Sequence, residues 1–407
     1  MNHMTIDRRN FLAATATLPF VSRFAFARAA SAPDARFVFI LLRGALDGLA
    51  AAPPYGDPAY AGLRRELAIA PPGAANGGLR LDGTFALHPN CGFLHECWQA
   101  RELLVAHAVA TPYRERSHFD GQDVLENGGV RPHALATGWL NRALAALPAV
   151  ARVGAHEARG EAGIALGQNL PLAMRGPAPV ASWSPSRLPA LDDDTLARIT
   201  DLYARDPVLS LRLADALAAD DVAREASMET AQRAAGARYL EAMRAAGSFL
   251  ARENGLQVAM LDTTGWDTHA NEGGAQGQLA TRLGALDAGL RALKEALGAA
   301  WPRSVVVLAT EFGRTAAVNG TRGTDHGTAT VAFVLGGAAL GGRMLTDWPG
   351  LSRGALYQQR DLAPTLDLRS VLKGVLHDHL RVSSAALDSD VFPGSSMARP
   401  AQDLIRA

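Results

Sequence analysis

The stretch RFVFILLRGALDG, residues 36–48, contains an unbroken apolar run at 37–42 that is rich in β-branched and aromatic side chains. Such a run is typical of a strand at the centre of a parallel sheet, where helices cover both faces. The run ends in a glycine-flanked turn that contains Asp47. The stretch therefore predicts the central strand of an α/β fold, with an acidic side chain at its carboxyl end.

Similar apolar runs predict four further strands, at residues 102–110, 256–262, 304–310 and 328–337. Helical patterns lie between them, at 93–102, 119–128, about 193–254 and 278–297. This alternation predicts parallel βαβ units with right-handed crossovers, and hence a three-layer α/β sandwich with a mostly parallel central sheet. The segment at about 155–190 is rich in Pro, Gly and Ser and breaks the alternation. We expect it to be an inserted loop or a small hairpin over one face.

The composition is that of an ordinary globular protein. Of 407 residues, 48% are hydrophobic and 20% are charged. The 40 basic side chains are balanced by 40 acidic ones, which argues against nucleic acid as a partner. A chain of this length buries enough apolar surface to fold without disulfide bonds.

Residues 1–32 have the features of a twin-arginine (Tat) signal peptide, which is excluded from the fold. Arg8 and Arg9 precede an apolar stretch at 11–21, and small residues suit cleavage after Ala29 or Ala32. The apolar stretch is too short to span a bilayer, and no later segment is a candidate span. We expect a periplasmic or secreted protein whose partners include the Tat export machinery. The remaining residues, 33–407, are expected to form the α/β domain.

The two cysteines, Cys91 and Cys97, form a disulfide in an oxidising compartment or remain buried thiols; the sequence leaves both open. They lie near His88 and His95 in LHPNCGFLHEC. A zinc site is conceivable there, but the spacing matches no standard zinc finger.

Chemically active side chains follow most of the predicted strands. In open α/β sheets the ligand site lies outside the carboxyl ends of the strands, so we expect these side chains to converge. They are Asp47 after the first strand; Ser117 and His118 after the second; Asp262, Asp267 and His269 after the third; Glu311 and Arg314 after the fourth; and Asp325 and His326 in the loop before the fifth.

Carboxylates crowded together repel one another unless a cation lies between them. We therefore expect one or two divalent ions. Mixed imidazole and carboxylate ligands suit Zn²⁺ or Mn²⁺ better than Ca²⁺ or Mg²⁺. The predicted ligands are Asp47, Asp262, Asp267, His269, Glu311, Asp325 and His326.

Each motif also has a simpler structural explanation. Asp47 could bind backbone amides within its own turn. In GWDTH, Asp267 or Thr268 could cap a helix. TEFGR could hold an ion pair between Glu311 and Arg314, and His326 could be an ordinary loop histidine. Only their joint occurrence at strand ends favours a metal site.

Ser117 precedes a predicted helix, so it is either a helix N-cap or a nucleophile, and the two roles are compatible. The helix N-terminus and a nearby cation would favour an anion there. Ser117, His118 and Arg314 are the candidate catalytic residues. Arg114 and Arg116 are candidate substrate-binding residues that could join Arg314 in clamping a phosphate or sulfate.

Taken together, RGALDGL, LHPN, RSHFDGQDVLENG, GWLNRAL, GWDTHAN, TEFGRT and GTDHG resemble the uncharacterised DUF1501 family of Tat-exported bacterial proteins. That family is similar to the alkaline phosphatase and sulfatase superfamily. The resemblance implies an alkaline-phosphatase-like fold, with Ser117 at the nucleophile position and Asp47 as a first-strand ligand. It also implies that His326 and His269, with Asp267 or Asp262, bind one metal and that Glu311 binds a second.

Two departures limit the resemblance. Glu311-Phe312 stands where the two-zinc phosphatases have an adjacent Asp-His, so the second metal loses an imidazole. Neither cysteine lies in the Cys-x-Pro-x-Arg setting of sulfatases, which argues against a formylglycine nucleophile.

The sequence thus favours an exported, metal-dependent hydrolase of phosphate or sulfate esters that acts on an anionic substrate through a serine nucleophile. Two alternatives remain open. One is a metal-binding, non-catalytic envelope protein that serves as a scaffold or binds a carbohydrate or a partner. The other is an enzyme that transfers the group to an acceptor other than water.

Overall fold

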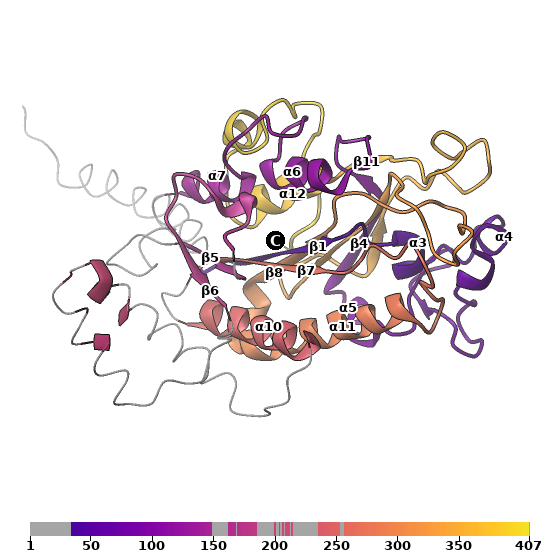
Figure 1. The fold of residues 1–407 in the computed structure, drawn as a ribbon, viewed down its shortest axis with the longest axis horizontal. Coiled ribbons are helices and arrows are strands. Elements are labelled where there is room, and N and C mark those ends of the chain that lie inside the picture. Colours follow the sequence, from indigo (N-terminus) through magenta and orange to yellow (C-terminus); the bar gives the residue numbers. More distant parts are fainter. Residues whose placement is uncertain are drawn as a thin grey trace, which may run out of the picture.

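The computed structural model describes residues 34–148, 162–184 except 168, 235–252 and 256–406, with a few positions between 199 and 214. The signal peptide expected at 1–32, with Arg8 and Arg9, lies outside the described residues, as does most of the helical tract expected at 193–254. The described chain is an α/β fold in which helices flank a central sheet on both faces (Figure 1). The α/β class with a mostly parallel sheet is confirmed.

Within the described residues, the central sheet has nine strands. β1 (Arg36–Arg43) lies between β7 (Val258–Thr264) and β8 (Ser304–Ala309), and all three run parallel. The complete order is β10 (Arg343–Leu345), β4 (Leu103–Ala110), β9 (Thr330–Leu335), β8, β1, β7, β5 (Gly163–Leu166) and β6 (Val180–Trp183), and β11 (Leu366–Asp367) also pairs with β4. A separate two-stranded sheet joins β2 (Leu79–Arg80) to β3 (Ala86–Leu87).

β9 runs antiparallel to both of its neighbours, β4 and β8. The expectation that the fifth predicted strand is part of a parallel βαβ unit is therefore wrong. The physical reason is that the segment between β8 and β9 contains no helix to carry the chain back across the sheet, so the chain reverses directly. As a result, the amino end of β9 lies at the same edge as the carboxyl ends of β8, β1 and β4.

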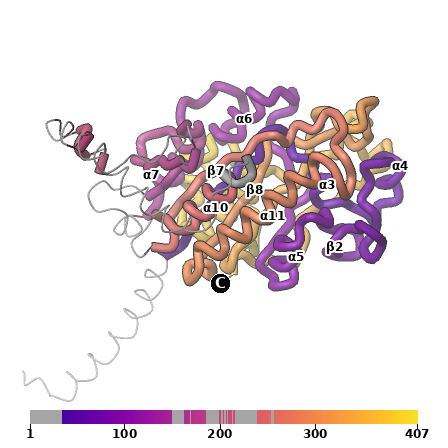
Figure 2. Tube along the Cα trace, turned by 60° about the horizontal axis from the view of Figure 1, so that its bottom comes forward, coloured from indigo at the N-terminus to yellow at the C-terminus, as the bar shows by residue number. Residues whose placement is uncertain are grey.

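The alternation of side chains along β1 builds a core on each face of the sheet. Val38, Ile40 and Leu42 pack into the cluster that contains side chains of α5 (Gly92–Gln99), α10 (Ala235–Ala251) and α11 (Gln278–Leu297). Their neighbours Phe37, Phe39 and Leu41 pack into the opposite cluster, with α6 (His118–Asn127), α7 (Trp139–Ala145) and α12 (Leu368–Asp378). Figure 2 shows α10 and α11 lying side by side along one face. The described residues also form the short helices α3 (Gly48–Ala51), α4 (Tyr60–Arg64) and α13 (Ser384–Ala386) and the brief helical segments Arg65–Leu67, Leu172–Met174, Gly298–Arg303 and Leu387–Val391.

The Pro/Gly-rich segment at about 155–190 differs from the expected loop or hairpin over one face. Its described part contributes β5 and β6, which extend the central sheet beyond β7 as parallel strands. The four residues of β5 are fully buried. The strands are only four residues long and lie among prolines and glycines, so no extended apolar pattern marks them in the sequence.

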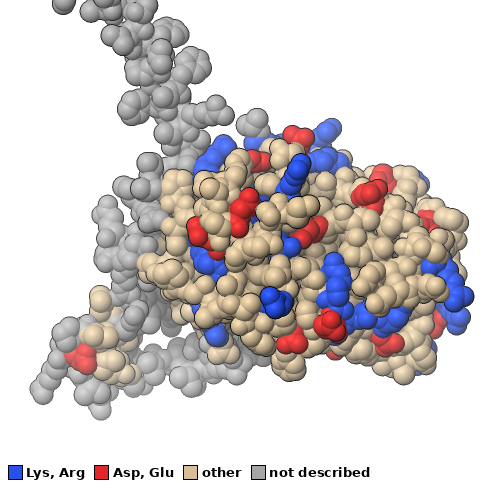
Figure 3. Space-filling view, turned by 90° about the horizontal axis from the view of Figure 1, so that it is seen from above, with Lys and Arg blue, Asp and Glu red and all other residues tan. Residues whose placement is uncertain are grey.

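Among the described residues, no helix combines the length and the apolar character needed to cross a membrane. Basic and acidic side chains are interspersed on the face above α6 and α7, and no single-sign patch covers it (Figure 3).

Cys91 and Cys97 are both buried and are free thiols in this structure. Burial raises the pKa of each thiol, that of Cys97 to about 12.

Candidate metal centre

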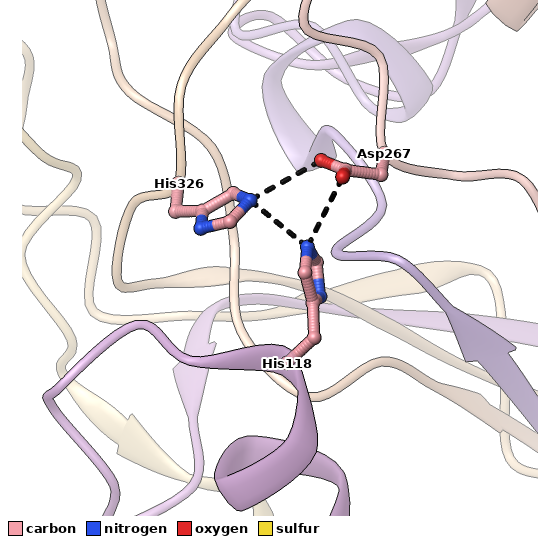
Figure 4. A group of neighbouring side chains, drawn as sticks. All are labelled: His118, Asp267 and His326. Atoms are coloured by element: carbon pink, nitrogen blue, oxygen red, sulfur yellow. Dashed lines mark hydrogen bonds and ion pairs between the residues drawn. The ribbon is translucent and has the colours of Figure 1, made fainter.

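Four side chains from three segments meet at the carboxyl edge of the sheet. His118 begins α6, Asp267 and His269 follow β7, and His326 precedes β9. His118, Asp267 and His326 each offer an atom within 4.8 Å of the other two, and Figure 4 shows the three side chains pointing toward one another. His269 joins them, with its Nε2 3.0 Å from Asp267 Oδ1 and 2.9 Å from His326 Nε2.

The other ring nitrogen of each histidine has a fixed partner. His326 Nδ1 lies 2.9 Å from the carbonyl oxygen of Arg116, which can only accept, so this nitrogen carries the proton. His118 Nδ1 lies 2.8 Å from Glu311 Oε1, and His269 Nδ1 lies 3.3 Å from Asp325 Oδ1. A histidine that is protonated at Nδ1 keeps a lone pair on Nε2, which is the arrangement that metal-binding histidines adopt.

The separations between the Nε2 atoms support a cation at this point. His326 Nε2 lies 2.9 Å from the Nε2 atoms of both His118 and His269. Unprotonated nitrogens at that distance repel each other, whereas Zn–N bonds of roughly 2.0–2.1 Å place neighbouring ligands roughly 3 Å apart. The four side chains are between 22% and 44% exposed, so solvent and small molecules can reach them. The donor set thus fits a divalent ion.

Arg314 holds Asp267 in place. Its guanidinium is completely buried and donates to Asp267 Oδ1, to the Thr324 carbonyl and, from Nε, to the Thr324 hydroxyl at 3.1 Å. Burial opposes ionisation of Asp267, but the Arg314 guanidinium outweighs it and lowers the pKa of this carboxyl. Because its side chain has no exposed surface, Arg314 acts on Asp267 rather than directly on a substrate.

Glu311, expected to be a metal ligand, faces hydrogen-bond donors. Its Oε1 accepts from Gly44 N at 2.8 Å, Gln122 Nε2 at 2.9 Å and His118 Nδ1, and its Oε2 accepts from Thr310 Oγ1 at 2.9 Å. Burial would raise the pKa of Glu311, but the hydrogen bonds from His118 and Gln122 hold it below its usual value. Glu311 therefore orients His118 as an ionised acceptor.

His118 and His326 respond differently to their surroundings. The hydrogen bond to Glu311 raises the pKa of His118. Burial, together with the nearby His118, lowers the pKa of His326. The neutral form that binds a metal is thus favoured most directly at His326.

Asp47 lies in a separate, buried ionic cluster. Its Oδ1 caps α3 by accepting from Leu49 N at 3.0 Å, and its Oδ2 pairs with Arg64, which also lies 3.5 Å from Glu272. Burial opposes ionisation of Asp47, but Arg64 lowers its pKa. Burial and the charge of Asp47 raise the pKa of Glu272 to about 8. A guanidinium thus supplies the positive charge that we expected a metal to supply at Asp47.

Two other predicted ligands also contact groups outside the cluster. Asp262 pairs with Arg43 at 2.5 Å. Asp325 orients His269 and accepts from Asn319 Nδ2 at 3.0 Å, and this hydrogen bond is the main cause of its lowered pKa.

Ser117 stands at the N-cap position of α6, immediately before His118, but its side chain makes no capping hydrogen bond. Arg114 donates to the carbonyl oxygens of Thr111 and Tyr113. Arg116 pairs with Asp361. The two arginines expected to clamp a substrate are thus engaged by protein groups.

The cluster of His88, Cys91, His95 and Cys97 does not form a ligand set within the part of the chain that the structure describes. His88 Nε2 lies 3.1 Å from the Gly274 carbonyl and His95 Nε2 lies 3.0 Å from the Arg80 carbonyl. These histidines thus form hydrogen bonds with backbone carbonyl groups.

The family described as "Protein of unknown function (DUF1501)" matches residues 97–391, well over half of the chain. The chain belongs to the DUF1501 family. No curated protein and no solved structure matches it.

Several residues that contact the predicted site residues of this DUF1501 protein were not foreseen from the sequence. Gln122 donates to Glu311, and Arg64 pairs with Asp47. Arg360 and Asp361, from a segment near the C-terminus, contact the His326 carbonyl and the Arg116 side chain. None of the four follows a predicted strand, so the strand-end argument could not find them.

Proposed function

We propose that this DUF1501 protein is an exported, metal-dependent hydrolase of phosphate or sulfate esters, related in fold and chemistry to the alkaline phosphatase and sulfatase superfamily. The observation that carries the proposal is the convergence of His118 Nε2, His326 Nε2 and the Asp267 carboxylate. His269 Nε2 lies 2.9 Å from His326 Nε2, and the Nδ1 of each imidazole lies next to an acceptor.

His118, Asp267, His269 and His326 would hold one ion, with Zn²⁺ or Mn²⁺ preferred for this mixture of nitrogen and oxygen donors. When bound, such a cation would neutralise charge on the non-bridging oxygens of the ester and favour ionisation of a nearby hydroxyl. The second ion expected from the sequence has weaker support, because Glu311 and Asp47 are already engaged by hydrogen-bond donors and by Arg64.

Ser117 is the proposed nucleophile. Its Oγ would form a bond to phosphorus or sulfur as the bond to the leaving alcohol breaks, with its proton passing to solvent, and water would then release phosphate or sulfate. Its position next to His118 and the absence of a capping hydrogen bond from its side chain support this role. The first amides of α6 lack partners within the helix and would favour an anion there.

Recognition of the anionic group is best assigned to Arg360, because the arginines proposed from the sequence are otherwise engaged. Arg360 is 41% exposed, and its Nη2 donates to the His326 carbonyl at 2.9 Å. Its Nη1 donates to Asp361 at 3.1 Å. These contacts use two of the five N–H groups of a guanidinium, so others are available to an anion.

The proposal is tested with chain purified without added metal. Elemental analysis should find Zn or Mn, and the metal-loaded protein should hydrolyse aryl phosphates or aryl sulfates. Ser117→Ala should retain the metal and lose at least 100-fold in kcat, whereas His326→Ala should lose the metal. Undiminished turnover by Ser117→Ala would remove the serine from the mechanism.

A metal-binding protein without catalytic activity is the second candidate. The engagement of Arg114, Arg116 and Arg314 by protein groups favours it, because a conventional arginine clamp is lacking among them. Bound metal together with no turnover across a broad panel of phosphate, sulfate and carboxylate esters would support this candidate.

A further inference from the structure

Asp361 is a buried carboxylate outside the cluster, in a segment with no predicted strand or motif. Its side chain has no exposed surface. Its Oδ2 accepts from Arg116 Nε at 2.9 Å and Thr328 Oγ1 at 2.8 Å and lies 2.8 Å from Arg116 Nη2 in an ion pair. Its Oδ1 accepts from Arg360 Nη1 at 3.1 Å. One carboxylate therefore ties together the loop before α6, the loop before β9 and its own segment.

The first of these contacts is made by a residue with an unusual backbone conformation. Arg116 has a φ of 60°, in the left-handed region that side-chain-bearing residues rarely adopt. Such a conformation persists only where the surroundings hold it. Here it places the Arg116 carbonyl 2.9 Å from His326 Nδ1 and leads directly into Ser117 and His118.

The remaining contacts fix His326 from its other side. Arg360, paired with Asp361, donates to the backbone carbonyl of His326. Thr328, whose hydroxyl donates to Asp361, is two residues beyond His326. The backbone of Asp361 also bridges Thr315, next to Arg314, and Arg314 binds Asp267. Asp361 thus supports the segments that carry His118 and His326 and contacts the segment of the arginine that orients Asp267.

We propose that Asp361 is a positioning residue of the metal centre, which sets the separation of His118 and His326 by holding Arg116 in its left-handed conformation. The inference rests on the proposed function in one respect, namely that these histidines bind a metal. Outer-shell groups of this kind typically change metal affinity by 10- to 100-fold when they are replaced.

The test uses the full chain, stripped of metal, and measures the affinity for Zn²⁺ alone by competition with a chromophoric chelator. Asp361→Asn keeps the shape of the side chain but removes the charge that holds Arg116. We expect Zn²⁺ affinity to fall by about 10- to 100-fold. We also expect the visible absorption of the Co²⁺ form to change, because its bands report ligand geometry.

Asp287→Asn is the matched control. Asp287 is a buried carboxylate of α11 that accepts two backbone N–H groups at the start of α5, and both helices pack on the opposite face of the sheet from α6. It should keep wild-type Zn²⁺ affinity and the wild-type Co²⁺ spectrum, which separates positioning from a general loss of stability.

Wild-type affinity and spectrum in Asp361→Asn would overturn the inference while leaving the proposed metal centre intact. A wild-type chain that binds neither ion would overturn both. If Asp361→Asn does not fold, Arg116→Lys replaces it, because Arg116 is the partly exposed partner in the ion pair with Asp361. A lower Zn²⁺ affinity with a changed Co²⁺ spectrum would then support the inference, and wild-type values of both would overturn it.

Discussion

Glu311 illustrates how one residue is assigned its role by its partners. Glu311 Oε1 accepts from Gly44, His118 and Gln122, and its Oε2 accepts from Thr310. A cation at Oε1 would have to displace the donors there. The same carboxylate holds the proton of His118 on Nδ1, so it strengthens Nε2 as a ligand.

Glu311→Gln should therefore weaken metal binding without removing a ligand. The glutamine amide cannot match the ionised acceptor for His118 Nδ1–H, and we expect a 10- to 100-fold lower Zn²⁺ affinity by competition titration. Asp262→Asn is the informative comparison, since Asp262 pairs with Arg43 and should leave affinity unchanged. Loss of metal in Asp262→Asn but not in Glu311→Gln would contradict the assignment of the ligands.

At the scale of elements, α5 depends on a neighbouring helix for its N-terminal cap. Cys91 occupies the N-cap position and makes no side-chain capping bond. Instead, Phe93 N and Leu94 N donate to Asp287 of α11, at 2.8 and 2.9 Å. The Asp287 carboxylate of α11 thus caps α5 and links the two helices.

Asp287→Ala should lower the free energy of unfolding by about 1–2 kcal/mol, the range found for lost helix caps. Urea denaturation measures the loss. Glu295→Ala, at an exposed position on the same helix, should change stability by less than about 0.5 kcal/mol. Equal stability of Asp287→Ala and the wild-type chain would show that α5 needs no cap from α11.

For the whole molecule, two buried histidines make stability depend on pH. Burial lowers the pKa of His107 and of His379 to about 4. In the unfolded chain an imidazole titrates near 6.5, so between these values the unfolded chain binds more protons than the folded one. Stability contributed by the neutral histidines is present above pH 6.5 and is lost as the pH falls toward 4.

Lowering the pH from 7 to 5 should therefore cost about 2 kcal/mol of stability for each of the two histidines. Urea unfolding at several pH values measures this loss. His379→Gln retains a donor for the Arg36 carbonyl, which His379 Nε2 contacts at 2.8 Å, and should have a shallower pH dependence. An identical slope in the variant and the wild-type chain would exclude His379 as a source.

The sequence by itself determined the longer strands of the central sheet and the edge at which the polar side chains that follow them lie. The apolar runs of β1, β4, β7 and β8 lie within a few residues of their predicted positions, because burial on both faces demands continuous apolar side chains. His326 reached the expected edge for a different reason. The strand after it runs antiparallel, whereas a parallel strand would have placed this histidine at the opposite edge.

Only the tertiary structure decided which of the gathered side chains face one another. Asp47 pairs with Arg64, and Glu311 and Asp325 face imidazole N–H groups, whereas His118 turns its Nε2 toward His326. A hydrophobic pattern records which segments are buried, because burial depends on a residue's own side chain. The role of a charged group depends on partners elsewhere in the chain, and these become neighbours only when the chain has folded.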